Sequence, residues 1–173
     1  MHHVYNLFSI KVTHAKLPIS INLHKKIIDF VNKKYERQPT HVSCVNGFQH
    51  HEDFEGKDEL NKIINRYIIE AQGIKLSNGW LNVLENKSYN QPHSHSNNWA
   101  TDSGVFYLSH DNNNITFTKD GEIFEIKPNL FDIILFPYDL VHYVLPEERV
   151  EKRICYAFNT EHFTNIKEVQ WTS

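Results

Sequence analysis

The sequence has few cysteines and no long apolar run. Its two cysteines, Cys44 and Cys155, are far apart and match no metal-binding spacing, so no disulfide framework is expected. No segment approaches the ~18 consecutive apolar residues of a membrane-spanning helix. The N-terminus lacks the basic and apolar regions of a signal peptide. These absences predict a soluble cytoplasmic protein that makes no membrane contact.

Clustered positive charge is also absent. The 18 Lys and Arg residues are outnumbered by 21 Asp and Glu residues, the formal net charge is -3, and no Lys/Arg-rich block occurs. A broad basic face for nucleic acid is therefore disfavoured. The 173 residues suffice for one domain with a full core. We expect a single domain over residues 1–173, with a helical N-terminal part (1–78), a β-roll core (79–160) and a tail (161–173). The oligomeric state is left open.

Two helices are predicted in the N-terminal part, after an opening strand over residues 4–12. The first extends from the N-cap residue Ser20 to about Lys34, because apolar residues recur there every four positions. The second starts near Asp58 and ends at Gly73, a suitable residue to follow a helix C-terminus. Its apolar stripe at i, i+3 and i+4 predicts that it packs on a sheet. Residues 39–57, between the helices, are expected to be irregular.

From Gly79 onward the apolar period changes to two, which indicates strands. Turn residues divide this part into eight short segments. The predicted strands are Trp80–Glu85, Gln91–His95, Gly104–Ser109, Asn114–Thr118, Glu122–Lys127, Asp132–Phe136, Val141–Leu145 and Arg153–Phe158. Helices followed by strands predict an α+β fold, with a double-stranded β-helix (jelly-roll or cupin-like) core backed by two N-terminal helices.

Three of the twelve histidines suggest a metal site. His93 and His95 stand at i and i+2 of a predicted strand, so both side chains project from one face. His142 lies on a later strand and can supply a third imidazole. Three imidazoles can take three adjacent corners of an octahedron and leave three open for other ligands. They also suit zinc with one open position, so the ligand count alone does not choose the metal.

A second group of metal-binding side chains, His50-His51-Glu52-Asp53, has a different interpretation. Four consecutive residues cannot all face one ion without a special loop. We expect this segment to line the mouth of a site. Together with the loop over residues 46–54, Trp99 and Tyr89 are candidates to hold a substrate.

Arg153 is the isolated charge of an otherwise uncharged strand. An unpaired arginine buried there would cost several kcal/mol, and a guanidinium is suited to grip a carboxylate through two hydrogen bonds. Two explanations stay open. A bound dicarboxylate could place one end on Arg153 and the other on the metal, or Arg153 could lie at the surface and pair with Glu147, Glu148 or Glu151.

The part of the chain from Asn82 to Asn159 resembles the 2-oxoglutarate/Fe(II)-dependent oxygenases of the prolyl-hydroxylase-like group. Within that group it is most similar to small oxygenases of marine bacteria and their phages. The matching motifs are Asn46-Gly47-Phe48-Gln49, Trp80-Leu81-Asn82, His93-Ser94-His95, Ser103-Gly104-Val105-Phe106-Tyr107-Leu108, Leu135-Phe136-Pro137, His142 and Arg153-Ile154-Cys155-Tyr156-Ala157-Phe158-Asn159.

The resemblance implies a dioxygenase that uses Fe(II), 2-oxoglutarate and O2, with ascorbate as a reductant in vitro. It also implies hydroxylation of a C–H bond in a protein, prolyl especially, or in a small molecule. His93 and His142 would be iron ligands and, with Arg153, the catalytic set. Arg153 and Tyr107 would bind the far carboxylate of 2-oxoglutarate, and Asn82 would lie near this cosubstrate.

The chain departs from the family pattern at three places. His95 stands where most relatives have an aspartate, Cys155 stands where many have a serine, and the turn Asn129-Leu130-Phe131-Asp132 lacks the usual glycine. We predict that His93, His95 and His142 all bind the metal. Two alternatives are that Asp102 supplies a carboxylate instead, or that His95 turns outward and leaves its position to water or chloride.

Two other functions remain compatible with the three histidines. One is a cupin-like metalloenzyme that does not use 2-oxoglutarate, and the other is a metal- or ligand-binding β-roll module without catalysis. Arg153→Ala separates the cupin-like enzyme from the oxygenase, because only the oxygenase needs Arg153 for 2-oxoglutarate. The β-roll module would bind metal but consume no oxygen with any substrate.

Overall fold

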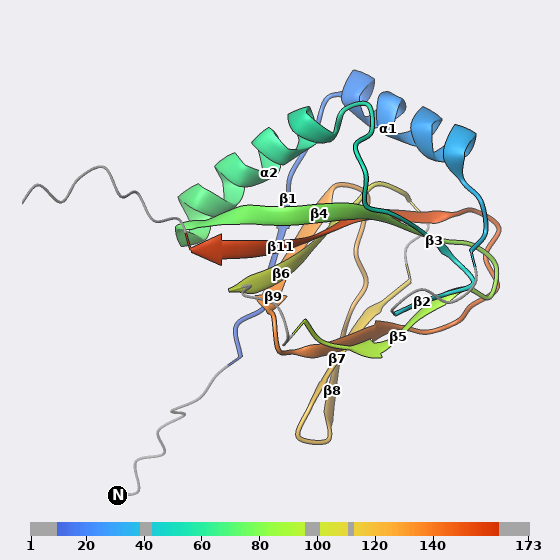
Figure 1. Cartoon of the computed structure of the whole chain (residues 1–173). Coiled ribbons are helices and arrows are strands. Elements are labelled where there is room, and N and C mark those ends of the chain that lie inside the picture. The colour runs from blue at the N-terminus through green and yellow to red at the C-terminus, as the bar shows by residue number, and fades with distance from the viewer. Residues whose placement is uncertain (1–9, 39–42, 96–100, 111–112, 163–173) are drawn as a thin grey trace, which may run out of the picture.

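The computed structural model describes residues 10–38, 43–95, 101–110 and 113–162. They form two helices and eleven strands, arranged as two facing sheets with both helices on one side (Figure 1). The elements are β1 Thr13–Lys16, α1 Ile21–Lys34, β2 Cys44–Val45, β3 Phe48–His50, α2 Lys57–Gln72, β4 Ile74–Leu84, β5 Tyr89–His93, β6 Asp102–Tyr107, β7 Ile115–Lys119, β8 Glu122–Ile126, β9 Asp132–Pro137, β10 Val141–Val144 and β11 Arg153–His162.

The chain crosses between the two sheets as it proceeds from β4 to β11. The larger sheet has the strand order β1-β9-β6-β11-β4-β3, and the smaller one has the order β2-β5-β10-β7-β8. Successive strands therefore alternate between the sheets, apart from the β7–β8 hairpin, which lies within the smaller sheet. This is a double-stranded β-helix of eight strands with all neighbours antiparallel. The predicted fold class is confirmed.

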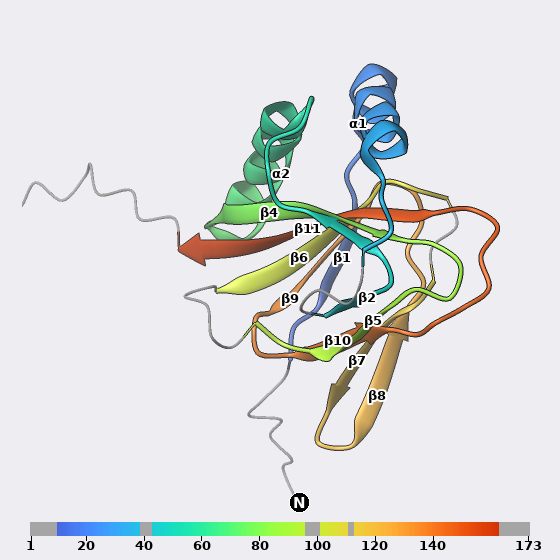
Figure 2. The same ribbon diagram turned by 45° about the vertical axis from the view of Figure 1, so that its right-hand side comes forward.

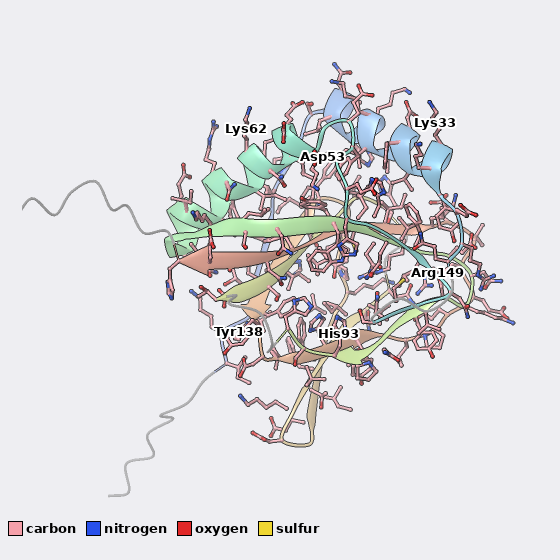
Figure 3. The ribbon with its side chains drawn as sticks, viewed as in Figure 1. Lys33, Asp53, Lys62, His93, Tyr138 and Arg149 are labelled. Atoms are coloured by element: carbon pink, nitrogen blue, oxygen red, sulfur yellow. The ribbon has the colours of Figure 1, made fainter. Side chains whose placement is uncertain are left out.

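Both helices cover the outer face of the larger sheet (Figure 2). α1 buries Leu23, Ile27 and Val31, while α2 buries one residue per turn in the same way, at Leu60, Ile64 and Ile68. These side chains share one core cluster with apolar residues of β4, β6, β9 and β11. Figure 3 shows the helices' charged side chains, such as Lys33 and Lys62, on the outer side, and His93 between the sheets.

The helix ends agree with the sequence prediction. The Ser20 hydroxyl accepts a hydrogen bond from the Leu23 N–H at 3.1 Å, as an N-cap does. Gly73 adopts the left-handed conformation, with φ of 67°, and its N–H donates to the Ile69 carbonyl. None of the described helices is long and apolar enough to cross a membrane.

Strand β11 organises the interior because its side chains alternate between two environments. Tyr156 and Phe158 point toward the helices and join their core cluster, where the Tyr156 hydroxyl donates to Asn61 Oδ1 of α2 at 2.7 Å. Arg153 and Cys155 point the other way, into the space between the two sheets. The helix side of β11 is thus structural, and its other side is available for a site.

Several strand boundaries differ from the predicted ones. The opening strand is β1, at Thr13–Lys16; residues 10–12 are not in a strand, and residues 4–9 lie outside the described residues. The segment predicted to be irregular contains β2 and β3, which are too short to show a period of two. β4 begins at Ile74, because Asn78 and Gly79 pair with β11 although they lack a strand-like composition; the adjacent Ser77 lies at a shift in the register between the two strands. β5 ends at His93, two residues earlier than predicted.

Candidate functional site

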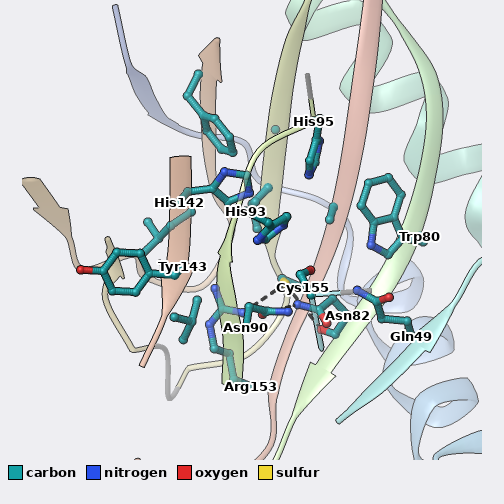
Figure 4. Close-up of a pocket in the computed structure, with 17 residues that line it drawn as sticks. Gln49, Trp80, Asn82, Asn90, His93, His95, His142, Tyr143, Arg153 and Cys155 are labelled. Carbon is teal, nitrogen blue, oxygen red and sulfur yellow. Dashed lines mark hydrogen bonds between the residues drawn. The ribbon is translucent and has the colours of Figure 1, made fainter. Parts of the chain in front are cut away.

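Three imidazoles converge between the two sheets. His93 on β5 and His142 on β10 lie directly opposite each other in the antiparallel pair, and His95 follows two residues after β5 ends. One ligand atom from each of the three lies within 4.8 Å of the others. The ring centroids of His93 and His142 are 4.2 Å apart, and both are just over 5 Å from that of His95 (Figure 4). The structure thus brings the three predicted ligands together.

Backbone carbonyls orient two of these imidazoles. His93 Nδ1 lies 2.8 Å from the Gln91 carbonyl oxygen, and His142 Nδ1 lies 3.0 Å from that of Leu140. A carbonyl oxygen can only accept, so Nδ1 carries the proton in both rings. Nε2 then keeps its lone pair, which is the tautomer that binds a metal through Nε2.

The protonation of the three imidazoles also suits metal binding. Burial lowers the pKa of His93 and His95 and holds that of His142 well below its ordinary value. For His142 the proximity of His93 lowers the pKa further, because two imidazolium charges repel each other. All three rings are therefore neutral at pH 7, the form that coordinates a metal ion.

Side chains rather than the backbone hold the ring of His95. Its Nδ1 lies 2.6 Å from Asn159 Oδ1 and 2.7 Å from Ser103 Oγ, and the Ser103 hydroxyl donates to the same Asn159 oxygen at 3.0 Å. The backbone N–H of His95 donates a hydrogen bond to the Tyr138 carbonyl oxygen. His95 is thus directed inward, contrary to the alternative in which it turns outward.

Asp102 does not contribute to this group. It begins β6, where its neighbour Ser103 points toward His95, so strand alternation turns the Asp102 side chain to the opposite face. Its backbone N–H and carbonyl both bond to the Thr160 hydroxyl. Within the described part of the chain, the group of close metal-binding side chains consists of three histidines and includes no carboxylate.

Arg153 is fully buried, with an exposed fraction of 1%. Its Nη1 lies 3.3 Å from Cys155 Sγ and its Nη2 lies 3.4 Å from the Tyr107 hydroxyl, while its Nε has no partner among the described residues. Burial raises the pKa of both the Cys155 thiol and the Tyr107 phenol, so both neighbours are neutral. None of the ion pairs among the described residues includes Arg153. Among the described residues, no carboxylate balances its positive charge.

This burial rules out one of the two explanations of Arg153. A surface pair with the glutamates of residues 147–151 is wrong, because the guanidinium is enclosed between the sheets and Glu148 instead pairs with Lys87. The other explanation, a bound carboxylate, agrees with a guanidinium that lines the same pocket as the three imidazoles (Figure 4).

The pocket between the imidazoles and Arg153 has polar and apolar walls. Asn82 donates through Nδ2 to Asn90 Oδ1 at 2.8 Å, and its own Oδ1 is buried without a partner among the described residues. Asn82 lines the pocket, whereas Tyr107, which the resemblance placed on the far carboxylate of 2-oxoglutarate, does not line it and lies in the buried cluster behind Arg153. Apolar wall residues are Val105, Ile115, Phe136 and Val144.

The loop before α2 lies at one side of this pocket. Gln49 lines it, and the His51 ring stacks on Trp80, whose centroid is 6.0 Å from that of His95. The neighbouring His50 packs among phenylalanine rings instead. Neither histidine belongs to the metal-binding group. Tyr89 does not line the pocket, and Trp99 lies outside the described residues.

Sequence reasoning missed three polar residues of this region. Asn90 contacts Asn82, and Ser103 and Asn159 contact His95. For Ser103 and Asn159 the sequence signal was a polar residue within a largely apolar strand, whereas Asn90 lies in a polar strand and gave no such signal. Ser103 and Asn159 stood within motifs that carried the family resemblance, but their role became visible only from the strand pairing.

Comparison with known proteins identifies structures with a similar fold. No protein-family model matches the sequence, and no curated protein matches it. Solved structures do match. One is a prolyl-4-hydroxylase from Pseudomonas putida, with 14% identity, a TM-score of 0.66, and coverage of 87% of this chain and 92% of that one. The fold is that of 2-oxoglutarate/Fe(II) oxygenases.

Two further neighbours are also prolyl hydroxylases. The enzyme from Trichoplax adhaerens, in complex with a fragment of the hypoxia inducible factor oxygen degradation domain, has 10% identity and a TM-score of 0.68, with coverage of 87% of this chain and 83% of that one. The viral collagen prolyl hydroxylase of Paramecium Bursaria Chlorella virus-1 has 14% identity and a TM-score of 0.63, with coverage of 87% and 96%. At such identities the likeness concerns the fold.

Proposed function

We propose that the protein is a non-haem Fe(II)- and 2-oxoglutarate-dependent dioxygenase that hydroxylates a C–H bond. The observation that carries this proposal is the pairing of two features in one pocket: three neutral imidazoles directed at a common point and a fully buried guanidinium without an anionic partner among the described residues. A 2-oxo dicarboxylate matches both features, because one end can chelate a metal and the other can accept from Arg153.

The residues present fit a divalent ion, with one difference from the usual set. Non-haem Fe(II) oxygenases commonly use two histidines and one carboxylate, whereas His95 supplies a third imidazole here. Three Nε2 atoms can still occupy one face of an octahedron and leave three positions open. Compared with a site of two histidines and one carboxylate, the site with its ion then has one more unit of positive charge. This charge strengthens the attraction for an anionic cosubstrate.

The roles of this chain's residues follow from their positions. His93, His95 and His142 would hold the ion, and Arg153 would bind the far carboxylate. The Tyr107 hydroxyl accepts a hydrogen bond from Arg153 Nη2 and so helps to orient the guanidinium. Asn82 offers its Oδ1 to the pocket as a hydrogen-bond acceptor. The apolar walls exclude water from the reacting groups. When bound, Fe(II) with 2-oxoglutarate and O2 supplies the oxidative chemistry that no side chain has, with succinate and CO2 as by-products.

The substrate proposed is a protein, with prolyl residues first, or a small molecule. The neighbours named as prolyl hydroxylases support the first choice, and one of them is in complex with a peptide fragment. The likeness to small oxygenases of marine bacteria and phages rests on the sequence motifs. A three-histidine cupin-like enzyme without 2-oxoglutarate is disfavoured, since it gives no reason for a buried Arg153.

The proposal is tested by binding and by turnover. Calorimetry with Mn(II)-loaded protein should show 2-oxoglutarate binding, and Fe(II)-loaded protein with O2 and ascorbate should form succinate. His142→Ala should lose metal binding and succinate formation, whereas Arg153→Met should keep the metal and weaken 2-oxoglutarate binding by ~100-fold or more, as expected for a lost charge-assisted pair.

Arg149→Met is the matched control for loss of a buried arginine. Arg149 is buried at 8% exposure and donates to Asn113 and to backbone carbonyls outside the pocket. The folded variant should bind 2-oxoglutarate as the wild type does. Equal 2-oxoglutarate affinity in the wild type and Arg153→Met would refute the proposal.

A further inference from the structure

We infer that Asn159 and Ser103 are positioning residues that make His95 a metal ligand. They fix the tautomer and the orientation of its imidazole from the opposite sheet, at the position where related sites use a charged carboxylate. The inference rests on the proposed function only in requiring a divalent metal at the three imidazoles. It needs neither 2-oxoglutarate nor a particular reaction.

The fold holds Asn159 and Ser103 in place before any metal binds. Asn159 on β11 and Ser103 on β6 lie directly opposite each other in the strand register. Both are buried, at 4% and 1% exposure, so their hydrogen bonds do not compete with bulk water. A buried polar group that loses its hydrogen-bond partner destabilises the fold, so this arrangement resists rearrangement.

The hydrogen-bond directions define the state of His95. Asn159 Oδ1 is an acceptor and already receives the Ser103 hydroxyl proton at 3.0 Å. The contact of 2.6 Å between this oxygen and His95 Nδ1 therefore requires a proton on Nδ1. The His95 Nε2 atom is left with its lone pair and belongs to the ring that faces His93 and His142.

His95 differs from the other two imidazoles in how this state is achieved. Backbone carbonyls hold Nδ1 of His93 and His142, and no substitution can remove them. His95 lies beyond the end of β5 and relies on two side chains of the larger sheet. The orientation and tautomer of the His95 ring can thus be changed by substitution of Asn159 or Ser103, while all three histidines are kept. This makes the inference testable.

The experiment measures Co(II) binding to the full chain by calorimetry and by visible absorption, whose d–d bands depend on the number and type of ligands. Asn159→Leu is close in volume but cannot accept, and Asn159→Asp keeps the acceptor. Loss of a hydrogen-bond partner behind a metal ligand typically weakens metal binding by ~10–100-fold. We expect that loss and an altered spectrum in Asn159→Leu, and wild-type affinity or tighter, with the wild-type spectrum, in Asn159→Asp.

Thr160→Val is the matched control. Thr160 is the next residue of β11, is fully buried, and bridges to the Asp102 backbone of β6 through its hydroxyl, but it faces away from the imidazoles. A purely structural role for the β6–β11 bridge predicts equal effects of Thr160→Val and Asn159→Leu. The positioning role predicts unchanged Co(II) affinity and spectrum in Thr160→Val.

The outcomes separate this inference from the proposed function. Wild-type Co(II) affinity and spectrum in Asn159→Leu would overturn the inference alone, and so would an additional loss when Asn159→Leu is combined with His95→Ala. Failure of 2-oxoglutarate to bind the metal-loaded protein would refute only the proposed function. Absence of any divalent-metal binding by the wild type would overturn both.

Discussion

Arg153 combines a full positive charge with complete burial, and its described polar neighbours are a neutral thiol and a neutral phenol. A buried ion that lacks a counter-charge costs several kcal/mol. The Tyr107 ring compensates only in part, with the guanidinium carbon 5.1 Å from its centroid. This side chain is therefore expected to lower the stability of the protein whenever no anion is bound.

Replacement of Arg153 by methionine should consequently stabilise the ligand-free protein. Arg153→Met keeps the length of the apolar stem and removes the buried charge, so we expect the free energy of unfolding to rise by about 1–2 kcal/mol. Urea denaturation without metal or 2-oxoglutarate measures this. A lower unfolding free energy than that of the wild type would show that Arg153 is compensated by a partner in the folded protein.

At the residue scale, the sequence identified groups with unusual chemistry but not their partners. His93, His95 and Arg153 were recognisable because imidazoles at short spacing and a lone charge in an apolar strand are rare. Asn159 and Ser103 were not, because a single polar residue in a strand is common. Their contacts with His95 join segments 64 and 8 residues apart, and only the fold specifies such pairs.

At the scale of elements, the side chain of Asp132 links β1 to the turn before β9. Asp132, the first residue of β9, contacts His14 of β1 at 2.9 Å and Lys16 at 3.7 Å, and it accepts from the Asn129 N–H at 2.7 Å. It stabilises the turn before β9, where Phe131 has a φ of 66°. This turn lacks the glycine that the family pattern has there. A non-glycine residue in the left-handed conformation costs roughly 1–2 kcal/mol.

The pH dependence of stability should reveal the contribution of Asp132. Burial alone would raise the pKa of this carboxyl, but the Asn129 N–H, His14 and Lys16 together lower it below its ordinary value. A lowered pKa stabilises the fold above the unfolded-state pKa of about 4. This contribution is lost as the pH falls through the folded-state pKa.

Asp132→Asn should therefore lower the unfolding free energy at pH 7 by about 1–2 kcal/mol, and its difference from the wild type should shrink below about pH 4. Urea denaturation over a pH series measures both. Asp29→Asn is the control, since Asp29 pairs with Lys25 on the exposed face of α1, where such pairs contribute under about 1 kcal/mol. A pH-independent difference for Asp132→Asn would contradict the argument.

Elements long enough to repeat an apolar pattern several times were predictable, and short elements were not. Both helices follow from apolar residues repeated on one face, and both end within a residue or two of the predicted positions. β2 and β3 have two and three residues, too few to display alternation. The early end of β5 was not foreseeable either, because the polar run from Gln91 to His95 gives no signal for where pairing with β10 stops.

For the whole molecule, the candidate metal site connects the two layers. His93 and His142 belong to the smaller sheet, whereas His95 is bonded to Ser103 and Asn159 of the larger one. A metal held by all three would tie the sheets together at this end. Binding to the folded state alone stabilises it by about 2.7 kcal/mol when the free ligand is 100-fold above its Kd.

Thermal unfolding should therefore shift upward with Co(II), Ni(II) or Zn(II), and a chelator should reverse the shift. Mg(II) is the control ion, because it prefers oxygen ligands and the site offers three nitrogens. His142→Ala should abolish the shift. An equal shift with Mg(II), or a shift retained in His142→Ala, would place the stabilising metal elsewhere on the protein.

The fold class could be predicted from the order of two helices followed by eight strands. The pairing of these strands could not, since β4 and β11 are neighbours in the sheet although most of the core lies between them in sequence. The resemblance to oxygenases supplied what local patterns lacked, namely the expectation that Arg153 and the imidazoles share one pocket. That residues 1–173 form a single domain stays a prediction.

The placement of His142 opposite His93 has a consequence for the folding of this protein. A slip of one residue between β5 and β10 would turn one imidazole to the wrong side of the sheet, while the content of helix and strand would hardly change. Circular dichroism would not detect such a misfolded form, whereas Co(II) absorption would. In refolding experiments, recovery of the metal spectrum should thus report correct strand alignment separately from the recovery of secondary structure.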